Sequence, residues 1–171
     1  MLYLALLPVL PSILMAGAVS AQSFFRVPPT QVSIHSGQLI ERQRSRTTIS
    51  VRVPDDANNR LEKIILSQLV NVDEWVWDKM KPLVYYGDYS SNTRGQEGLA
   101  TVKYSEERDD LVIILTPAVK PGEQVNIIFR GFNPAAGTYQ WSSELVPEGP
   151  KPISSEGPML RLNIYQFAPT R

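Results

Sequence analysis

The sequence predicts an all-β fold, an antiparallel β-sandwich of the Ig-like, Greek-key kind with about eight or nine short strands. Three observations predict it. Turn signals built from Gly, Pro, Asn and Asp recur roughly every dozen residues, the runs between them are rich in β-branched and aromatic residues, and no long segment has a convincing helical period. A β-barrel is the main alternative architecture.

The expected strands follow one another along the chain, each bounded by turn residues. They cover residues 31–35, 47–53, 63–68, 74–78, 83–86, 100–104, 111–115, 124–132, 138–146 and 160–167. Residues 61–70 also fit helical spacing, but the neighbouring elements are strands, which favours a strand there. Two prolines predict a turn over residues 117–122, and residues 147–158 are expected to form a loop.

The first 21 residues resemble a secretory signal peptide. They carry no charge, and a run of small residues places Val19 and Ala21 at the −3 and −1 positions that signal peptidase recognises, so we expect cleavage before Gln22. No basic residue precedes Arg26, which departs from the usual signal and leaves an uncleaved membrane anchor as the alternative. The expected product is one domain, residues 22–171, outside the cytoplasm in the periplasm, the envelope or the medium.

Composition excludes several function classes. The chain has 17 basic and 17 acidic residues, so no overall field attracts nucleic acid. It has no cysteine, which excludes disulfides, thiolate nucleophiles, cysteine metal sites and lipoprotein acylation. His35 is the single histidine, and Met80 and Met159 are the methionines after the signal segment, which argues against a metal-handling periplasmic sandwich. We expect no cofactor.

Ten short segments, taken together, resemble one protein family. They are Val53-Pro54, Leu61-Glu-Lys-Ile-Ile-Leu-Ser-Gln68, Thr93-Arg-Gly95, residues 99–104, Leu111-Val-Ile-Ile-Leu-Thr-Pro117, Val119-Lys-Pro-Gly122, Val125-Asn-Ile-Ile-Phe-Arg130, Asn133-Pro134, Gly137-Thr-Tyr139 and Pro147-Glu-Gly-Pro-Lys-Pro152. Their order and spacing over residues 30–167 resemble an exported cyanobacterial family known as domain of unknown function 2808. The resemblance implies a small exported all-β domain and transfers no catalytic or ligand-binding residue.

Two clusters of acidic residues are candidates for catalysis or metal binding. Asp73, Glu74 and Asp78 lie beside two tryptophans. They are the best candidates for the two catalytic carboxylates of a hydrolase acting on envelope glycans. The acidic turn at residues 106–110 lacks the spaced ligand pattern of a calcium loop, so a solvated hairpin tip is the favoured interpretation.

Trp75 and Trp77 are the first binding candidates. On a strand they share one face, and an exposed pair near Tyr85 and Tyr86 would suit stacking on sugar rings or on a partner protein. The favoured alternative places both indoles in the core with Val76 outside, because a sandwich needs bulky residues between its sheets.

Arg42, Arg44 and Arg46 are the second binding candidates. If the segment is extended, their alternation puts three guanidinium groups on one face, which suits anionic polysaccharide or phosphate. Protection of an edge strand, or a plainly solvated face, is the favoured alternative.

Tyr139 ends the run Gly137-Thr138-Tyr139 at a strand start, as in the tyrosine corner of Greek-key sandwiches, where the phenol donates to a backbone carbonyl upstream. The sequence as a whole thus predicts a non-enzymatic exported module of the cell envelope that binds polysaccharide or protein, with the glycan hydrolase as the alternative.

Overall fold

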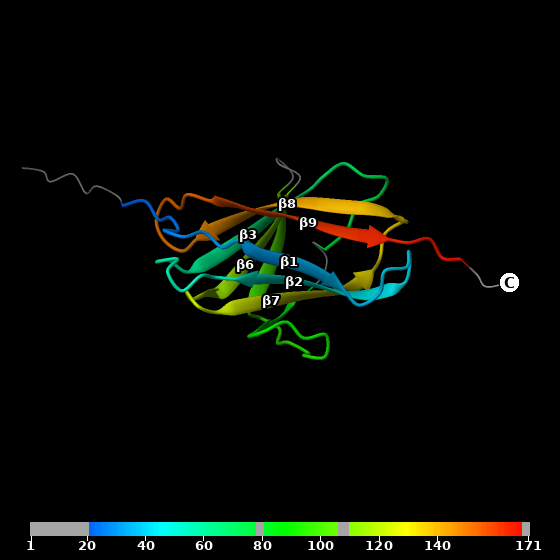
Figure 1. Cartoon of the computed structure of the whole chain (residues 1–171), viewed down its shortest axis with the longest axis horizontal. Coiled ribbons are helices and arrows are strands. Elements are labelled where there is room, and N and C mark those ends of the chain that lie inside the picture. Colours follow the sequence, from blue (N-terminus) through cyan, green and yellow to red (C-terminus); the bar gives the residue numbers. More distant parts are fainter. Residues whose placement is uncertain (1–20, 78–80, 106–109, 169–171) are drawn as a thin grey trace, which may run out of the picture.

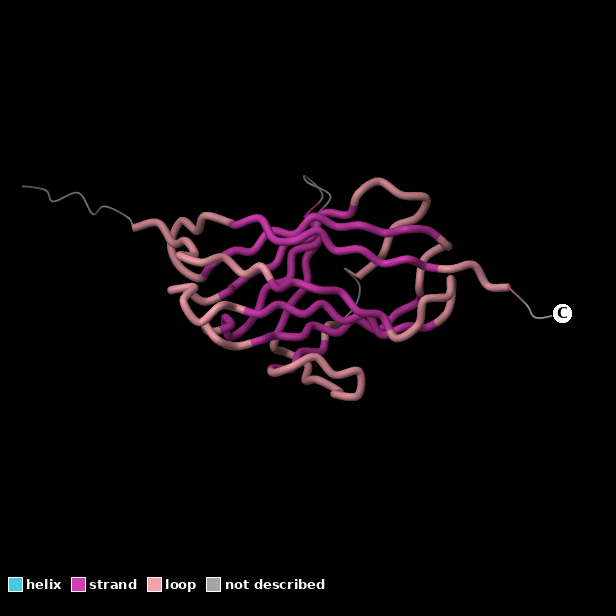
Figure 2. The backbone as a smooth tube through the Cα atoms, viewed as in Figure 1, coloured by secondary structure: helices cyan, strands magenta, loops and turns pink. Residues whose placement is uncertain are grey.

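Two antiparallel sheets pack face to face in the computed structural model, which describes residues 21–77, 81–105 and 110–168 (Figure 1). Nine strands form them: β1 (Gln31–Ser36), β2 (Arg44–Arg52), β3 (Leu61–Gln68), β4 (Leu83–Tyr86), β5 (Ala100–Ser105), β6 (Asp110–Val119), β7 (Gln124–Phe132), β8 (Gly137–Pro147) and β9 (Ser155–Ile164). The described ranges contain no helix, and thus none that could cross a membrane (Figure 2).

The strand order confirms the sandwich and excludes a closed barrel. One sheet has the order β1-β2-β7-β4 and the other β5-β6-β3-β8-β9. The chain crosses between the sheets after β2, β3, β4, β6 and β7, as in Greek-key sandwiches. On one side of the molecule β1 lies beside β9 (Figure 1).

The core lies between the two sheets and follows the alternation of each strand. Ile49 and Val51 of β2 pair with Ile127 and Val125 of β7 and are fully buried, together with Ile64 of β3. The intervening residues of β2 therefore point to the opposite face of the sheet.

The strand prediction fails in the segment that carries the tryptophans. Residues 74–77 are irregular, and Asp78 lies outside the described residues. The backbone N–H of Trp75 donates to the Gln68 side chain instead of to a neighbouring strand. The Trp75 N–H thus bonds to a side-chain acceptor, where the alternating pattern predicted a backbone carbonyl of a neighbouring strand.

Pro117 is not the start of a turn, because β6 continues to Val119. The Thr116 N–H still donates to the Leu99 carbonyl just before β5, but residues 117 and 118 have no partner in the pairing of β6 with β3 or β5, so the proline removes no ladder hydrogen bond there. The predicted loop at residues 147–158 is also shorter than expected. β9 already begins at Ser155, which pairs with Leu145 of β8.

The connection between β4 and β5 folds back over the outer face of the four-stranded sheet (Figure 1). The Arg46 guanidinium of β2 donates to the carbonyl oxygens of Ser90, Ser91 and Thr93. Gly95 has φ +73, and a Cβ there would lie 3.1 Å from both Ile128 Cδ1 and Leu83 Cβ. This loop is therefore fixed to the sheet at two points.

Candidate functional site

Five aromatic side chains pack together in the core beside residues 69–77. Trp77 stacks on Phe129 of β7 and on Trp141 of β8, each with ring centroids 5.2 Å apart. Trp75 lies 5.3 Å from Trp77 and 5.4 Å from Tyr139. Such offset and edge contacts stabilise the cluster beyond simple burial.

Burial confirms the core interpretation of the two tryptophans. Trp75 is 8% and Trp77 2% exposed, whereas Val76 between them is 45% exposed. An exposed aromatic strip is therefore wrong. Tyr85 does not join the cluster either, because it lies on β4 and its hydroxyl donates to the Ser90 carbonyl.

Side chains hold the irregular segment in place. Gln68 at the end of β3 donates to the Asp73 carbonyl and accepts from the Trp75 N–H, both at 3.0 Å. The two carboxylate oxygens of Asp73 accept from the backbone N–H groups of Glu74 and Ala135, at 2.9 and 3.0 Å. Residues 73–75 are thus fixed by side-chain hydrogen bonds without belonging to a sheet.

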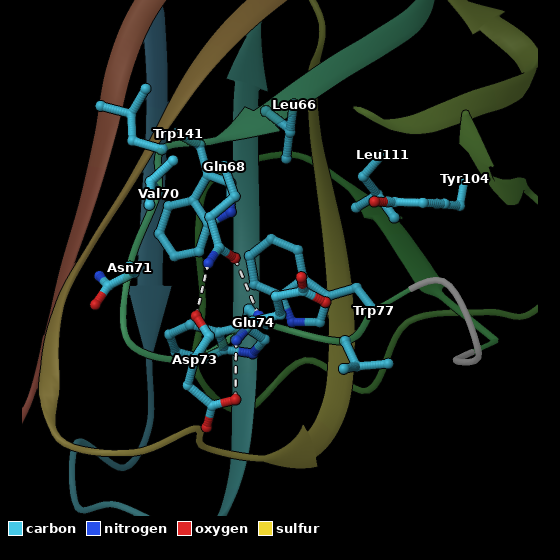
Figure 3. A pocket seen from close by; sticks show the side chains of 13 residues that line it. Leu66, Gln68, Val70, Asn71, Asp73, Glu74, Trp77, Tyr104, Leu111 and Trp141 are labelled. Carbon is cyan, nitrogen blue, oxygen red and sulfur yellow. Dashed lines mark hydrogen bonds between the residues drawn. The ribbon is translucent and has the colours of Figure 1, made fainter. Parts of the chain in front are cut away.

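A partly open pocket of about 340 Å³ lies between this segment and the five-stranded sheet. Its lining is aromatic, aliphatic and polar at once: Leu66, Gln68, Leu69, Val70, Asn71, Asp73, Glu74, Trp75, Val76, Trp77, Tyr104, Leu111 and Trp141. Figure 3 shows Tyr104 and Leu111 on one side of it and Val70 and Asn71 on the other. Its size is that of a small-molecule site.

The pocket has an apolar rim and one exposed carboxylate that the segment does not use. Val70 and Tyr104 are both exposed at its edge. Glu74 is exposed as well, and its side chain takes part in none of the hydrogen bonds that hold the segment. An exposed aromatic ring beside a free carboxylate can stack on a sugar ring and bind its hydroxyls.

The same geometry bears on the hydrolase alternative. A glycosidase needs two carboxylates about 5–10 Å apart that both reach the sugar. Both carboxylate oxygens of Asp73 accept hydrogen bonds from backbone N–H groups. Asp78 lies outside the described residues. Glu74 is the remaining carboxylate of that predicted set.

The arginine ladder forms in part. Arg44 and Arg46 lie on one face of β2, but Arg42 precedes the strand in a turn and has φ 58. The prediction of three guanidinium groups on one strand face is therefore wrong. Edge protection is also wrong, because β2 lies between β1 and β7. Arg46 is held by the β4–β5 loop, and the Arg44 guanidinium lies 5.5 Å from the centre of the Phe132 ring.

Tyr139 makes the backbone contact expected of a tyrosine corner. Its hydroxyl donates to the carbonyl of Ala135, four residues upstream, at 2.8 Å. Burial, with the nearby charges of Asp73 and Glu41, raises the pKa of this phenol, which keeps it in the neutral form that donates. The same residue therefore connects the aromatic cluster to the β7–β8 turn.

His35 lies on β1 and contacts the β4–β5 loop. Its ring stacks on Tyr89 with centroids 4.0 Å apart, and Nε2 lies 3.1 Å from Ser33 Oγ. Desolvation lowers the pKa of the imidazole. Within the described ranges, no group of three His, Cys, Asp or Glu side chains is placed to hold a metal ion.

The acidic turn predicted at residues 106–110 lies outside the described residues except for Asp110. That residue begins β6, is buried and accepts a hydrogen bond from the Ser67 hydroxyl.

Sequence reasoning missed two residues of the pocket and one residue beside the arginine pair of β2. Trp141 and Tyr104 line the pocket, and Arg130 lies directly across from Arg46 on β7. The alternation of Tyr139 and Trp141 along β8 was the available signal for the first. The other two needed the strand pairing, which local sequence does not contain.

The family comparison covers most of the chain. Residues 22–164 match the family described as Protein of unknown function (DUF2808). The chain belongs to the DUF2808 family. No curated protein matches this DUF2808 chain.

Several solved structures are similar to this DUF2808 member at low identity. A Nocardia farcinica protein with an immunoglobulin-like fold is 14% identical, with 78% of this chain and 96% of that chain covered and a TM-score of 0.45. The bacterial hydrophobin BslA is 12% identical, with 84% and 98% covered and a TM-score of 0.47. The collagen-binding domain of a Staphylococcus aureus adhesin is 7% identical, with 78% and 96% covered and a TM-score of 0.40. At these TM-scores the similarities carry no conclusion about function.

Proposed function

We propose that this protein is a non-enzymatic, exported module of the cell envelope that binds a glycan segment in the pocket beside residues 69–77. The pocket itself carries the proposal: aromatic rings form part of its lining, and the exposed Glu74 carboxylate, which the bonds of the segment do not use, supplies a polar group. Sugar recognition needs both, since rings stack on the apolar face of a pyranose and polar groups bind its hydroxyls.

The direct test is binding of the purified protein to isolated bacterial envelope at high ionic strength. Tyr104→Ala combined with Glu74→Gln removes two exposed pocket groups without touching the buried indoles. We expect this double variant to lose about tenfold in affinity, since each contact contributes about 0.5–1.5 kcal/mol. Tyr165→Ala, an exposed tyrosine outside the pocket, is the matched control.

Unchanged binding by the folded double variant would contradict the pocket as the glycan site. Release of reducing ends from envelope material, lost in Glu74→Gln, would contradict the non-enzymatic part. Export is tested separately by N-terminal sequencing of the protein from the extracytoplasmic fraction, where we expect Gln22 as the first residue. An N-terminus upstream of Gln22 on membrane-bound protein would support the anchor instead.

A further inference from the structure

The two sheets differ in charge. The strands of the four-stranded sheet contain Arg44, Arg46, Arg52 and Arg130 and no Asp or Glu. The strands of the five-stranded sheet carry both signs: Glu62, Lys63, Lys103, Asp110, Glu144, Glu156 and Arg161. Because the whole chain has no net charge, the positive charge of the first sheet is a local feature.

Strand register gathers three of these arginines at one end of the outer face. Arg44 and Arg46 are two residues apart on β2, on the side opposite the buried Ile49 and Val51. Arg130 of β7 lies directly across from Arg46, and Phe132 directly across from Arg44. We call these four residues the arginine face.

The arginine face is unfavourable in the isolated protein. Like charges directly opposite each other on neighbouring strands destabilise a sheet. Among the described residues, no carboxylate forms an ion pair with any of its three arginines, whereas Arg52 on the same sheet pairs with Asp88 at 3.6 Å. Both strands are interior to the sheet, so edge protection does not account for the charge.

The four residues differ in their availability to a ligand. Arg46 is bound to loop carbonyls, and its Nε is buried without a partner among the described groups. Arg44 and Arg130 are exposed, and Phe132 is 61% exposed. Arg46 therefore positions the loop and adds to the positive potential of this face, while Arg44 and Arg130 present their guanidinium groups to solvent.

We propose that the arginine face binds an acidic polysaccharide. Arg44 and Arg130 donate to carboxylate or sulfate groups of successive sugars, because the guanidinium fork matches both anions. Phe132 packs against the sugar ring between them. An interior sheet face suits an extended polymer, and complementary charge offsets the repulsion between the arginines. This surface is separate from the pocket, so the proposal does not depend on the pocket function.

The test measures binding of the purified protein to alginate, dextran sulfate, uncharged dextran and polyglutamate across a salt series. We expect alginate, dextran sulfate or both to bind, with affinity falling as salt rises. The tighter of the two identifies the anion as carboxylate or sulfate. Arg44→Gln with Arg130→Gln should weaken that binding by about tenfold or more. Arg44→Lys should lose part of the affinity, since it keeps the charge but not the fork.

The matched control is Arg161→Gln with Lys120→Gln. It also removes two positive charges, but from exposed positions away from the arginine face. We expect it to bind as the unchanged protein does. A melting curve shows that each variant is folded. The proposal is overturned if neither acidic glycan binds, if uncharged dextran binds equally, or if the control loses as much affinity as Arg44→Gln with Arg130→Gln. Equal binding of polyglutamate would overturn the choice of a glycan over an acidic polypeptide.

Discussion

Single buried polar groups connect the core of this protein to its turns, and Tyr139 is the clearest case. Its ring is fully buried beside Trp75, and its hydroxyl donates to the Ala135 carbonyl. Tyr139→Phe keeps the ring and removes this bond, so we expect a loss of about 1 kcal/mol in the free energy of unfolding. Urea denaturation measures it, with Tyr165→Phe at an exposed site as control. Equal stability of the two variants would contradict a structural role for the bond.

At the same scale, His35 predicts a pH dependence. Its pKa is lowered in the folded protein from the ordinary value of 6.5, because stacking against Tyr89 desolvates the ring. The unfolded chain then binds more protons, so stability falls as the pH drops through the region of pH 6.5. Melting temperatures between pH 8 and pH 5.5 should decline less in His35→Gln than in the unchanged protein. Parallel declines would rule out the imidazole as the cause.

Strands were predictable from the sequence where the alternation of apolar and polar residues agreed with the flanking turn residues. They were not predictable where side chains, instead of a neighbouring strand, bind the backbone. Residues 83–86 and 124–132 are strands with the predicted bounds. Residues 74–77 alternate as a strand would, yet the backbone N–H groups of Glu74 and Trp75 donate to the side chains of Asp73 and Gln68. Those two partners precede the segment in sequence, but their side-chain bonds form only when the turn closes. Alternation predicted that the two indoles share a side, and the need for bulky residues between the sheets favoured the core as that side.

The β4–β5 loop yields the prediction that belongs to this scale. Arg46 binds three of its carbonyl groups, so Arg46→Ala should release it from the sheet. Arg94 lies within the loop and provides a trypsin site. We expect cleavage after Arg94 to be at least severalfold faster in Arg46→Ala, followed by mass spectrometry. Arg44→Ala, which removes an arginine that does not bind the loop, should leave the rate of cleavage unchanged. Equal acceleration in both variants would contradict the role of Arg46 in holding the loop on the sheet.

For the whole molecule, both proposed binding surfaces depend on juxtapositions that only the strand pairing creates. Arg44 and Arg46 were visible as a local alternation, but Arg130 is distant in sequence and joins them through the register of β2 with β7. Trp141 likewise reaches the pocket from β8. The sequence therefore predicted the residue types of both surfaces and part of their membership. It did not show that one surface is a pocket and the other a sheet face beside the β4–β5 loop.

Two separate surfaces predict two separable components of envelope binding. Contacts of exposed charges weaken as salt shortens the Debye length, whereas aromatic contacts in a pocket are little affected. Arg44→Gln with Arg130→Gln should therefore lose the salt-sensitive part of binding to isolated envelope and keep the rest. Tyr104→Ala with Glu74→Gln should do the reverse. If the two surfaces act independently, the free-energy losses add in the fourfold variant, because one pair of substitutions lies in the pocket and the other on the four-stranded sheet. A combined loss far from that sum would show that both surfaces hold one continuous ligand.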